Sequence, residues 1–240
     1  MKTTKHKSTE RGFANYEWLQ AKYSFNFSNY FDPFKNNFGA LRVLNDDIIQ
    51  GGTGFGNHPH DNMEIITIPL KGSLKHKDSM SNQWVSLHTG EVQVMSAGTG
   101  IFHSERNNSE TEPINLFQIW IIPNKQNVEP FYTQKKFDTR DRINKLQTLV
   151  SSHTDLDENS LKIHQDARIS RIDLSENNKF IYNLKSIDHC VYVMLISGEM
   201  SINNEILKPR DALGIEETTN VSLLSNKNSE VLFIEIPKIF

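Results

Sequence analysis

Short runs of apolar and β-branched residues, separated by turns, recur along the chain. The run Glu64 to Leu70 reads EIITIPL, and Lys71-Gly72-Ser73 closes it as a turn. A similar short run precedes it at 41–44, and others follow at 74–78, 83–87, 92–96 and 114–122. Helical periodicity is almost absent, and 138–149 is the best helix candidate. The pattern therefore predicts an all-β sandwich or barrel.

One segment concentrates aromatic residues. It carries Trp18, Tyr23, Phe25, Phe27, Tyr30, Phe31 and Phe34. Between Tyr23 and Phe27 the aromatic positions alternate with polar ones, as in a half-buried strand. We expect these side chains to pack into a core, and stacking against a ligand is the less favoured alternative.

The second half of the chain repeats the first in outline. The segments 191–196, Gly198, 200–202, 206–207 and 211–212 follow the same order of strand, glycine turn, strand and tight turn as 65–92. Aligning Gly72 with Gly198 places Leu184, Ser186 and Cys190 opposite His58, His60 and Glu64. We expect a unit at 1–137, a polar connection within 123–154, and a second unit at 138–240 without metal ligands.

Charge and composition exclude several classes of partner. The net charge is −3 with Lys and Arg spread along the chain, so direct nucleic-acid binding is not expected. The single cysteine, Cys190, excludes an internal disulfide and fits a reducing compartment. No apolar run reaches the roughly 20 residues that span a bilayer, and the polar start MKTTKHKSTERGF has no signal-peptide core. These features predict a cytoplasmic protein without membrane contact.

Two short motifs suggest a metal site. Gly52-x5-His58-Pro59-His60-x3-Glu64 is followed by His103-Ser104-Glu105. Residues i and i+2 of a strand project to the same face, so His58 with His60, and His103 with Glu105, can point into one cavity. Three imidazoles and a carboxylate suit Fe(II), Mn, Ni, Cu or Zn, whereas Ca and Mg prefer oxygen.

These motifs resemble those of the cupin superfamily, whose first motif is G-x5-H-x-H-x3-E-x6-G, with one extra residue here before Gly72. More specifically, HPH, LKHKDS (74–79), TGEVQ (89–93) and MSAGTGIFHSE (95–105) look like the pirin family. Earlier, Arg11-Gly12, Trp18-Leu19, the aromatic segment and LRVLNDD (41–47) are also similar to pirin sequences. The likeness is dense over 11–123 and weaker beyond. The short length and the second half without ligands resemble the bacterial pirin-like quercetin 2,3-dioxygenases.

The resemblance implies a bicupin, with two jelly-roll β-barrels face to face and one metal in the N-terminal barrel. Carried over residue by residue, it implies His58, His60, His103 and Glu105 as the metal ligands. Glu64 is then expected to lie beside the ligands without binding the metal. His76 has the same strand parity as Glu64 and is expected to lie beside the ligands too. The sequence departs from the family's HPHRGFE at Asp61, Asn62 and Met63 of HPHDNME. The resemblance therefore does not determine the residues of the pocket rim or the choice of substrate.

The function that the resemblance implies is a metal-dependent dioxygenase, most simply with Fe(II), that opens the heterocycle of a flavonol such as quercetin. Its partners would be an aromatic small molecule and dioxygen. Glu105 would act as the general base, and apolar residues of 64–70 and 92–95 would line the pocket. The alternatives are a metal-dependent regulatory or redox-sensing protein that binds a protein partner, and a non-redox cupin such as a sugar isomerase.

Overall fold

Strands dominate the structure, which is a computed structural model describing residues 1–239. Two short 3-10 helices, Ser8–Glu10 and Thr139–Arg142, are the helical elements of this range. No helix within residues 1–239 is long and apolar enough to cross a membrane. The all-β prediction is confirmed, because the short alternating runs form strands that pair in four sheets.

The N-terminal half contains a large sheet and a small sheet. The large sheet has the order β12-β9-β6-β11-β4-β3-β2, and the small one β5-β10-β7-β8. The strand bounds of the large sheet are β2 (Gly12–Asn15), β3 (Leu19–Tyr23), β4 (Leu41–Ile49), β6 (Glu64–Lys71), β9 (Glu91–Ser96), β11 (Ile114–Ile121) and β12 (Phe131–Lys136). Those of the small sheet are β5 (Gly54–His60), β7 (Ser73–Asp78), β8 (Val85–His88) and β10 (Ile101–Asn107).

The C-terminal half repeats this pair of sheets strand by strand. Its large sheet has the order β1-β20-β17-β22-β15-β13-β14, and its small sheet β16-β21-β18-β19. The bounds are β1 (Lys2–His6), β13 (Gln147–Ser152), β14 (Leu161–Ile163), β15 (Arg168–Leu174), β16 (Lys179–Asn183), β17 (His189–Ser197), β18 (Met200–Ile202), β19 (Glu205–Leu207), β20 (Ala212–Glu216), β21 (Asn220–Ser225) and β22 (Ser229–Pro237). The repeat predicted from the glycine turns is therefore a repeat of sheets.

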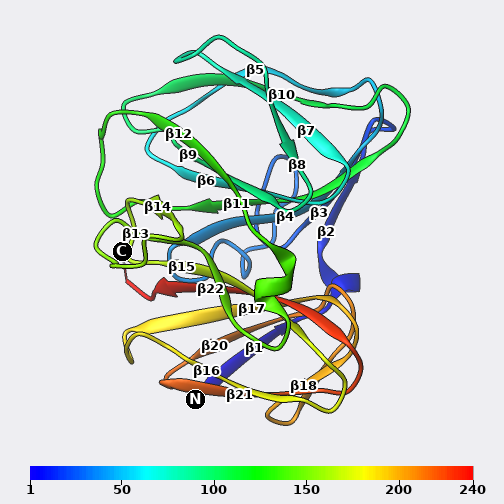
Figure 1. Ribbon diagram of the computed structural model, residues 1–240, viewed down its shortest axis with the longest axis vertical. Coiled ribbons are helices and arrows are strands. Elements are labelled where there is room, and N and C mark those ends of the chain that lie inside the picture. Colours follow the sequence, from blue (N-terminus) through cyan, green and yellow to red (C-terminus); the bar gives the residue numbers. More distant parts are fainter. Residues whose placement is uncertain (240) are drawn as a thin grey trace.

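The first strand departs from the order of the chain. β1 pairs antiparallel with β20, from Lys2 opposite Glu216 to His6 opposite Ala212. In Figure 1 this blue strand lies among the yellow to red strands of the C-terminal half. It takes the edge position that β12 takes beside β9 in the other half. Residues 2–6 thus complete the C-terminal sheet, although we expected the segment from residue 1 to 137 as one unit.

The two large sheets pack face to face and share one hydrophobic core. Ile66 and Ile68 of β6 lie in the same buried cluster as Tyr192 of β17 and Ile234 of β22. A second cluster fills the C-terminal barrel with apolar side chains, including that of Leu184. This arrangement agrees with the bicupin expectation, with the halves stacked one above the other in Figure 1.

The helix expected over 138–149 is absent. A single 3-10 turn ends at Arg142, and Asn144 has the left-handed φ of 53°, which interrupts a right-handed helix. β13 begins at Gln147 and joins the C-terminal sheet. The prediction was wrong because the polar segment offers no apolar stripe that a helix could bury.

The aromatic segment is only partly a core. Tyr23 and Phe25 are buried, as expected. Phe31 and Phe34, in contrast, are 77% and 93% exposed. Regular alternation ends with β3 at Tyr23, and the chain then runs through turns and isolated bridges whose side chains do not follow strand parity.

Candidate metal centre

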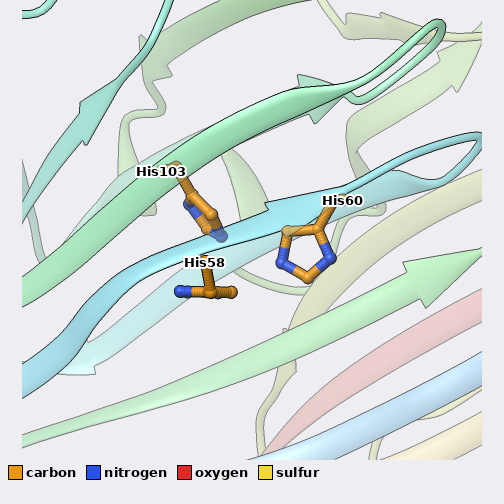
Figure 2. A group of neighbouring side chains, drawn as sticks. All are labelled: His58, His60 and His103. Atoms are coloured by element: carbon orange, nitrogen blue, oxygen red, sulfur yellow. The ribbon is translucent and has the colours of Figure 1, made fainter.

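Three imidazoles meet in the N-terminal barrel. His58 and His60 lie two residues apart on β5, and His103 lies opposite His58 on the paired strand β10. The ring centroids are 4.3 Å apart for His58 and His103, 4.8 Å for His60 and His103, and 4.9 Å for His58 and His60. Figure 2 shows the three rings around a common space, with two on β5 and one on β10. Their ligand atoms all lie within 4.8 Å of one another, which is close enough to hold one ion.

Hydrogen bonding selects the free nitrogen of His58. Its Nδ1 lies 2.7 Å from the carbonyl oxygen of Gly56. A carbonyl only accepts, so Nδ1 carries the proton and donates, and Nε2 is left as a lone-pair donor. A backbone carbonyl that orients an imidazole in this way is a common support of metal-binding histidines.

The other two imidazoles are kept neutral by burial. Burial lowers the pKa of His60 to about 4, with the charge of His58 adding to the effect. Burial also lowers the pKa of His103 to about 2, with His58, His60 and His76 adding to it. A metal binds the neutral form of histidine, so at neutral pH these rings need no deprotonation before binding.

Glu105 belongs to a second, deeper group with His76 and His103. Its carboxylate accepts from Gln118 Nε2, at 2.8 and 3.1 Å to the two oxygens. Burial raises the pKa of Glu105 to about 7, and the hydrogen bond from Gln118 opposes that rise. A shift in the pairing of β10 with β5 falls between His103 and Glu105, and the carboxylate still lines the cavity.

His76 is a buried neighbour of the imidazole group. Its ring centroid lies 5.2 Å from that of His103, and it stacks on Tyr132 at 4.6 Å. Its Nε2 lies 3.1 Å from Asp78 Oδ2, and Gln93 Nε2 approaches its Nδ1 at 3.4 Å. Both ring nitrogens are therefore occupied by protein contacts.

Glu64 lies on the other face of the large sheet, away from the imidazoles. Its Oε1 accepts from Ser96 Oγ at 2.8 Å. It has the parity of Ile66 and Ile68, which pack in the core between the barrels, whereas Ile65 faces the cavity. The expectation that Glu64 sits beside the ligands was wrong, because the turn at 61–63, where Asn62 has a φ of 42°, breaks the alternation of β5.

A cavity of about 540 Å³ opens onto the imidazoles. Its walls are mainly aromatic and apolar, with polar groups concentrated around the histidines and on β4. The lining consists of Trp18, Leu19, Ala21, Tyr23, Phe27, Ser28, Asn45, Asp47, Gly54, Phe55, Gly56, Asn57, His58, His60, Ile65, His103, Glu105, Gln118 and Trp120. This size matches pockets that enclose a small organic ligand.

The walls come from other residues than expected. Of the segments 64–70 and 92–95, only Ile65 lines the cavity. Trp18, Tyr23 and Phe27 instead form part of the wall, and they also pack with a buried apolar cluster. Trp120 packs edge-on against His60 at 4.8 Å.

Three polar lining residues on strands of the large sheet were missed altogether. Gln118 interrupts the apolar run INLFQIWI, and Asn45 and Asp47 interrupt the strand LRVLNDDII. A polar residue at an inward position of a strand marks either a hydrogen-bonded pair or a site, and this signal was available in the sequence.

The donor set fits a single divalent transition metal. Both ring nitrogens of His103 are buried without a hydrogen-bond partner in residues 1–239. Leaving a buried polar atom unpaired costs about 1–3 kcal/mol, which a metal–nitrogen bond would offset. Imidazole nitrogens beside a carboxylate are the ligands that Fe, Mn, Ni, Cu and Zn accept.

Both candidate groups within residues 1–239 lie in the N-terminal barrel. In the C-terminal barrel, Leu184 is buried in the apolar core, and Cys190 lies in the core between the two halves. The interior that holds the cavity in one half is filled by apolar side chains in the other.

Comparisons with known proteins agree with this architecture. The Pirin family profile matches residues 5–121, and that of the quercetinase C-terminal cupin domain matches residues 149–236. The chain is 40% identical to a quercetin 2,3-dioxygenase of Escherichia coli (strain K12) over 233 residues, which are 97% of this chain and 98% of the relative. It is 38% identical to a pirin-like protein of Caulobacter vibrioides over 93% of this chain and 95% of that one.

A solved structure is similar over almost the whole chain. The bacterial pirin YhhW from Escherichia coli, in complex with nickel(II), superposes with a TM-score of 0.92 at 38% sequence identity. The match covers 99% of this chain and 100% of that protein.

Proposed function

The chain belongs to the pirin family, and from this membership we propose that it is a metal-dependent dioxygenase that opens the heterocycle of a flavonol such as quercetin. The observation that carries the proposal is the aromatic cavity of about 540 Å³ that ends on the histidine cluster. The overall reaction consumes one dioxygen and releases carbon monoxide and a depside. Relatives from two strains of Escherichia coli, each matching 97% of this chain, bear the name quercetin 2,3-dioxygenase, which supports the same reaction.

The proposed ligands are His58, His60, His103 and Glu105, with Fe(II) as the metal. When bound, the metal supplies Lewis acidity that lowers the pKa of the substrate's enolic hydroxyl group. The imidazoles of His60 and His103 are neutral at neutral pH, so these two ligands can bind a cation without prior loss of a proton. Gln118 holds the carboxylate of Glu105 by hydrogen bonds to both oxygens, which fixes its orientation.

Glu105 is also the proposed general base. A general base must lie within hydrogen-bond reach of the proton that it accepts, and Glu105 lines the cavity that would hold the substrate. The proton that it accepts is that of the enolic hydroxyl. Gln118 can stay hydrogen-bonded to Glu105 when the carboxylate is protonated, because a carboxamide both donates and accepts hydrogen bonds.

The walls favour a flat aromatic substrate over a sugar. Trp18, Phe27 and Trp120 offer ring faces and edges, and no Lys or Arg lies among the residues that line this cavity. Stacking on aromatic side chains suits the flat rings of a flavonol.

The proposal is tested by stripping the purified protein of metal, reloading it with Fe(II), Mn(II) or Ni(II), and following oxygen consumption and quercetin absorbance. We expect turnover with at least one metal and release of carbon monoxide. Glu105→Gln should lower kcat by about 100-fold or more, because the base is lost, while metal analysis still finds bound metal.

The matched control is Glu112→Gln, the same change at an exposed carboxylate in the loop after β10, which should keep wild-type turnover. Absence of oxygen consumption with all three metals over a panel of flavonols would overturn the proposal.

A further inference from the structure

The face of β4 that lines the cavity carries two polar residues that the proposed metal site does not use. Asn45 and Asp47 lie two residues apart and both line the cavity. Their cross-strand neighbours on β3 are Tyr23 and Ala21, which line the same cavity. β4 belongs to the large sheet and the histidines to the small one, so a ligand in the cavity lies between these two polar residues and the imidazoles.

Each of these two residues has one buried side-chain oxygen without a protein partner within residues 1–239. Asn45 is 2% exposed and Asp47 3% exposed. Within residues 1–239, Oδ1 of each is buried and has no hydrogen-bond partner. Burying an unpaired carboxylate costs several kcal/mol, so a protein usually pairs such a group or keeps it for a ligand.

The adjacent Asp46, in contrast to Asp47, has side-chain partners for its carboxylate. It points to the opposite face, where Arg210 Nε lies 3.1 Å from its Oδ2 and Asn115 Nδ2 donates to its Oδ1 at 2.8 Å. Asp47 has no cation of this kind, since no Lys or Arg lines the cavity. Burial raises the pKa of Asp47 well above its usual range, with the charges of Asp46 and Glu105 adding to the rise.

We propose that Asp47 and Asn45 bind hydroxyl groups of the substrate on the side of the cavity away from the imidazoles, and that Asp47 thereby selects polyhydroxylated aromatic compounds. This inference rests on the proposed function, because it concerns the same cavity. The aromatic walls of the cavity suit a flat ring system. The unpaired Oδ1 atoms of Asn45 and Asp47 can each accept a hydrogen bond from a ligand that donates one. A phenolic hydroxyl is a donor carried on such a ring. Asp47 is thus a specificity-determining residue, and the metal site holds the reacting end.

The selectivity has a physical basis in the unpaired oxygens. A substrate with a hydroxyl at this position replaces water on the carboxyl by a hydrogen bond. An analogue without that hydroxyl leaves the carboxyl buried and unpaired, and sites of this kind reject such analogues strongly.

The test measures binding of flavonols to the metal-loaded protein without oxygen, by quenching of the fluorescence of Trp18 and Trp120, which line the cavity. The probes are quercetin and analogues that each lack one hydroxyl. We expect Asp47→Leu to lower the affinity for quercetin by about 10-fold or more. For the analogue that lacks the contacted hydroxyl, the affinity of this variant should stay within about twofold of the wild-type affinity. Asp47→Asn should keep part of the selectivity, because its carboxamide oxygen still accepts.

The matched control is Asp46→Asn, on the opposite face of the same strand, which should retain wild-type discrimination among the analogues. Thermal unfolding checks the fold, and Asp47→Leu should melt at or above the wild-type temperature because an unpaired carboxyl is removed. If Asp47→Leu does not fold, Asp47→Asn decides the question: partly reduced discrimination among the analogues supports the role of Asp47, and unchanged discrimination overturns it.

An equal loss of affinity for every flavonol, or no change for any, would overturn the role of Asp47. Failure of wild type to bind any flavonol would overturn it too. Hydroxyl-dependent binding without oxygen consumption would instead support this inference while overturning the dioxygenase, so the two failures are distinguishable.

Discussion

Glu64 is a buried carboxyl whose role is set by the contact between the two barrels. It is 1% exposed, and Ser96 supplies the one hydrogen bond to Oε1, while Oε2 has no partner within residues 1–239. Burial raises its pKa to about 7, and the hydrogen bond from Ser96 opposes the rise. A buried carboxyl of this kind is stable when protonated and costly when ionised.

We predict that Glu64→Gln stabilises the metal-free protein by an amount that grows as pH rises from about 4.5 to about 7 and is then constant. The folded-state pKa lies above the ordinary value of 4.5, so the stability associated with the proton is present below about pH 4.5 and is lost as pH rises through about 7. Gln mimics the protonated form, and near pH 8 the gain in the free energy of unfolding is about 3 kcal/mol at most. Urea unfolding at several pH values measures it.

The control is Glu129→Gln, the same change at an exposed carboxylate, which should leave the pH dependence of stability unaltered. A gain from Glu64→Gln that is equally large near pH 4 and pH 8 would contradict the burial argument.

At the scale of elements, the close pairing of β5 with β10 positions the histidines. Gly54 of β5 lies opposite Arg106, and a Cβ added there would lie 2.2 Å from the carbonyl oxygen of Glu105 and 2.5 Å from Arg106 Cα. Both contacts are with backbone, so a side chain could be accommodated only by moving one strand away from the other. The ladder that holds His58 and His60 against His103 therefore needs glycine at this position.

We predict that Gly54→Ala weakens metal binding by about tenfold or more, because the two ligand strands separate. Competition with a chromogenic chelator, using Ni(II), measures the affinity. Gly56→Ala is the matched control, since a Cβ at Gly56 meets nothing within 4 Å and its carbonyl remains available to His58. Equal affinities of the two variants would show that strand separation does not control the site.

At the scale of the whole molecule, the two halves stabilise each other through the shared core. Ile234 of β22 is fully buried in the cluster that also contains Ile66 and Ile119 of the N-terminal sheet. Each large sheet covers an apolar face of the other, and β1 carries the start of the chain into the C-terminal sheet. Separating the halves would expose both faces, so we expect them to unfold together.

The tryptophans make this coupling measurable. All three, Trp18, Trp84 and Trp120, lie in the N-terminal half. We predict that Ile234→Ala, in the C-terminal half, lowers the free energy of unfolding by about 2–4 kcal/mol as reported by tryptophan fluorescence, with circular dichroism giving the same midpoint.

Ile181→Ala, the same change at a side chain that is 57% exposed, should alter stability by less than about 0.5 kcal/mol. If Ile234→Ala shifts the dichroism transition and leaves the fluorescence transition unmoved, the halves unfold independently.

Local patterns predicted the strands well and the helix poorly. Runs such as EIITIPL form strands because alternation and β-branched residues act over a few neighbouring residues. The segment 138–149 had no such signal, and its polar composition was mistaken for a helix. The spacing of His58 and His60 also predicted that their side chains share one face. Both lie on β5, and this parity holds within one continuous strand.

By itself, the sequence determined the all-β class, the repeat of two halves, the family, and the two motifs whose imidazoles the strands bring together. These follow from residue order over short distances. Only the tertiary structure decided that Glu64 faces the other barrel, that β1 joins the C-terminal sheet, and that aromatic side chains from β3 and β11 wall the cavity beside an unpaired Asp47. Each depends on which sheet faces which, and hence on contacts between segments far apart in the chain.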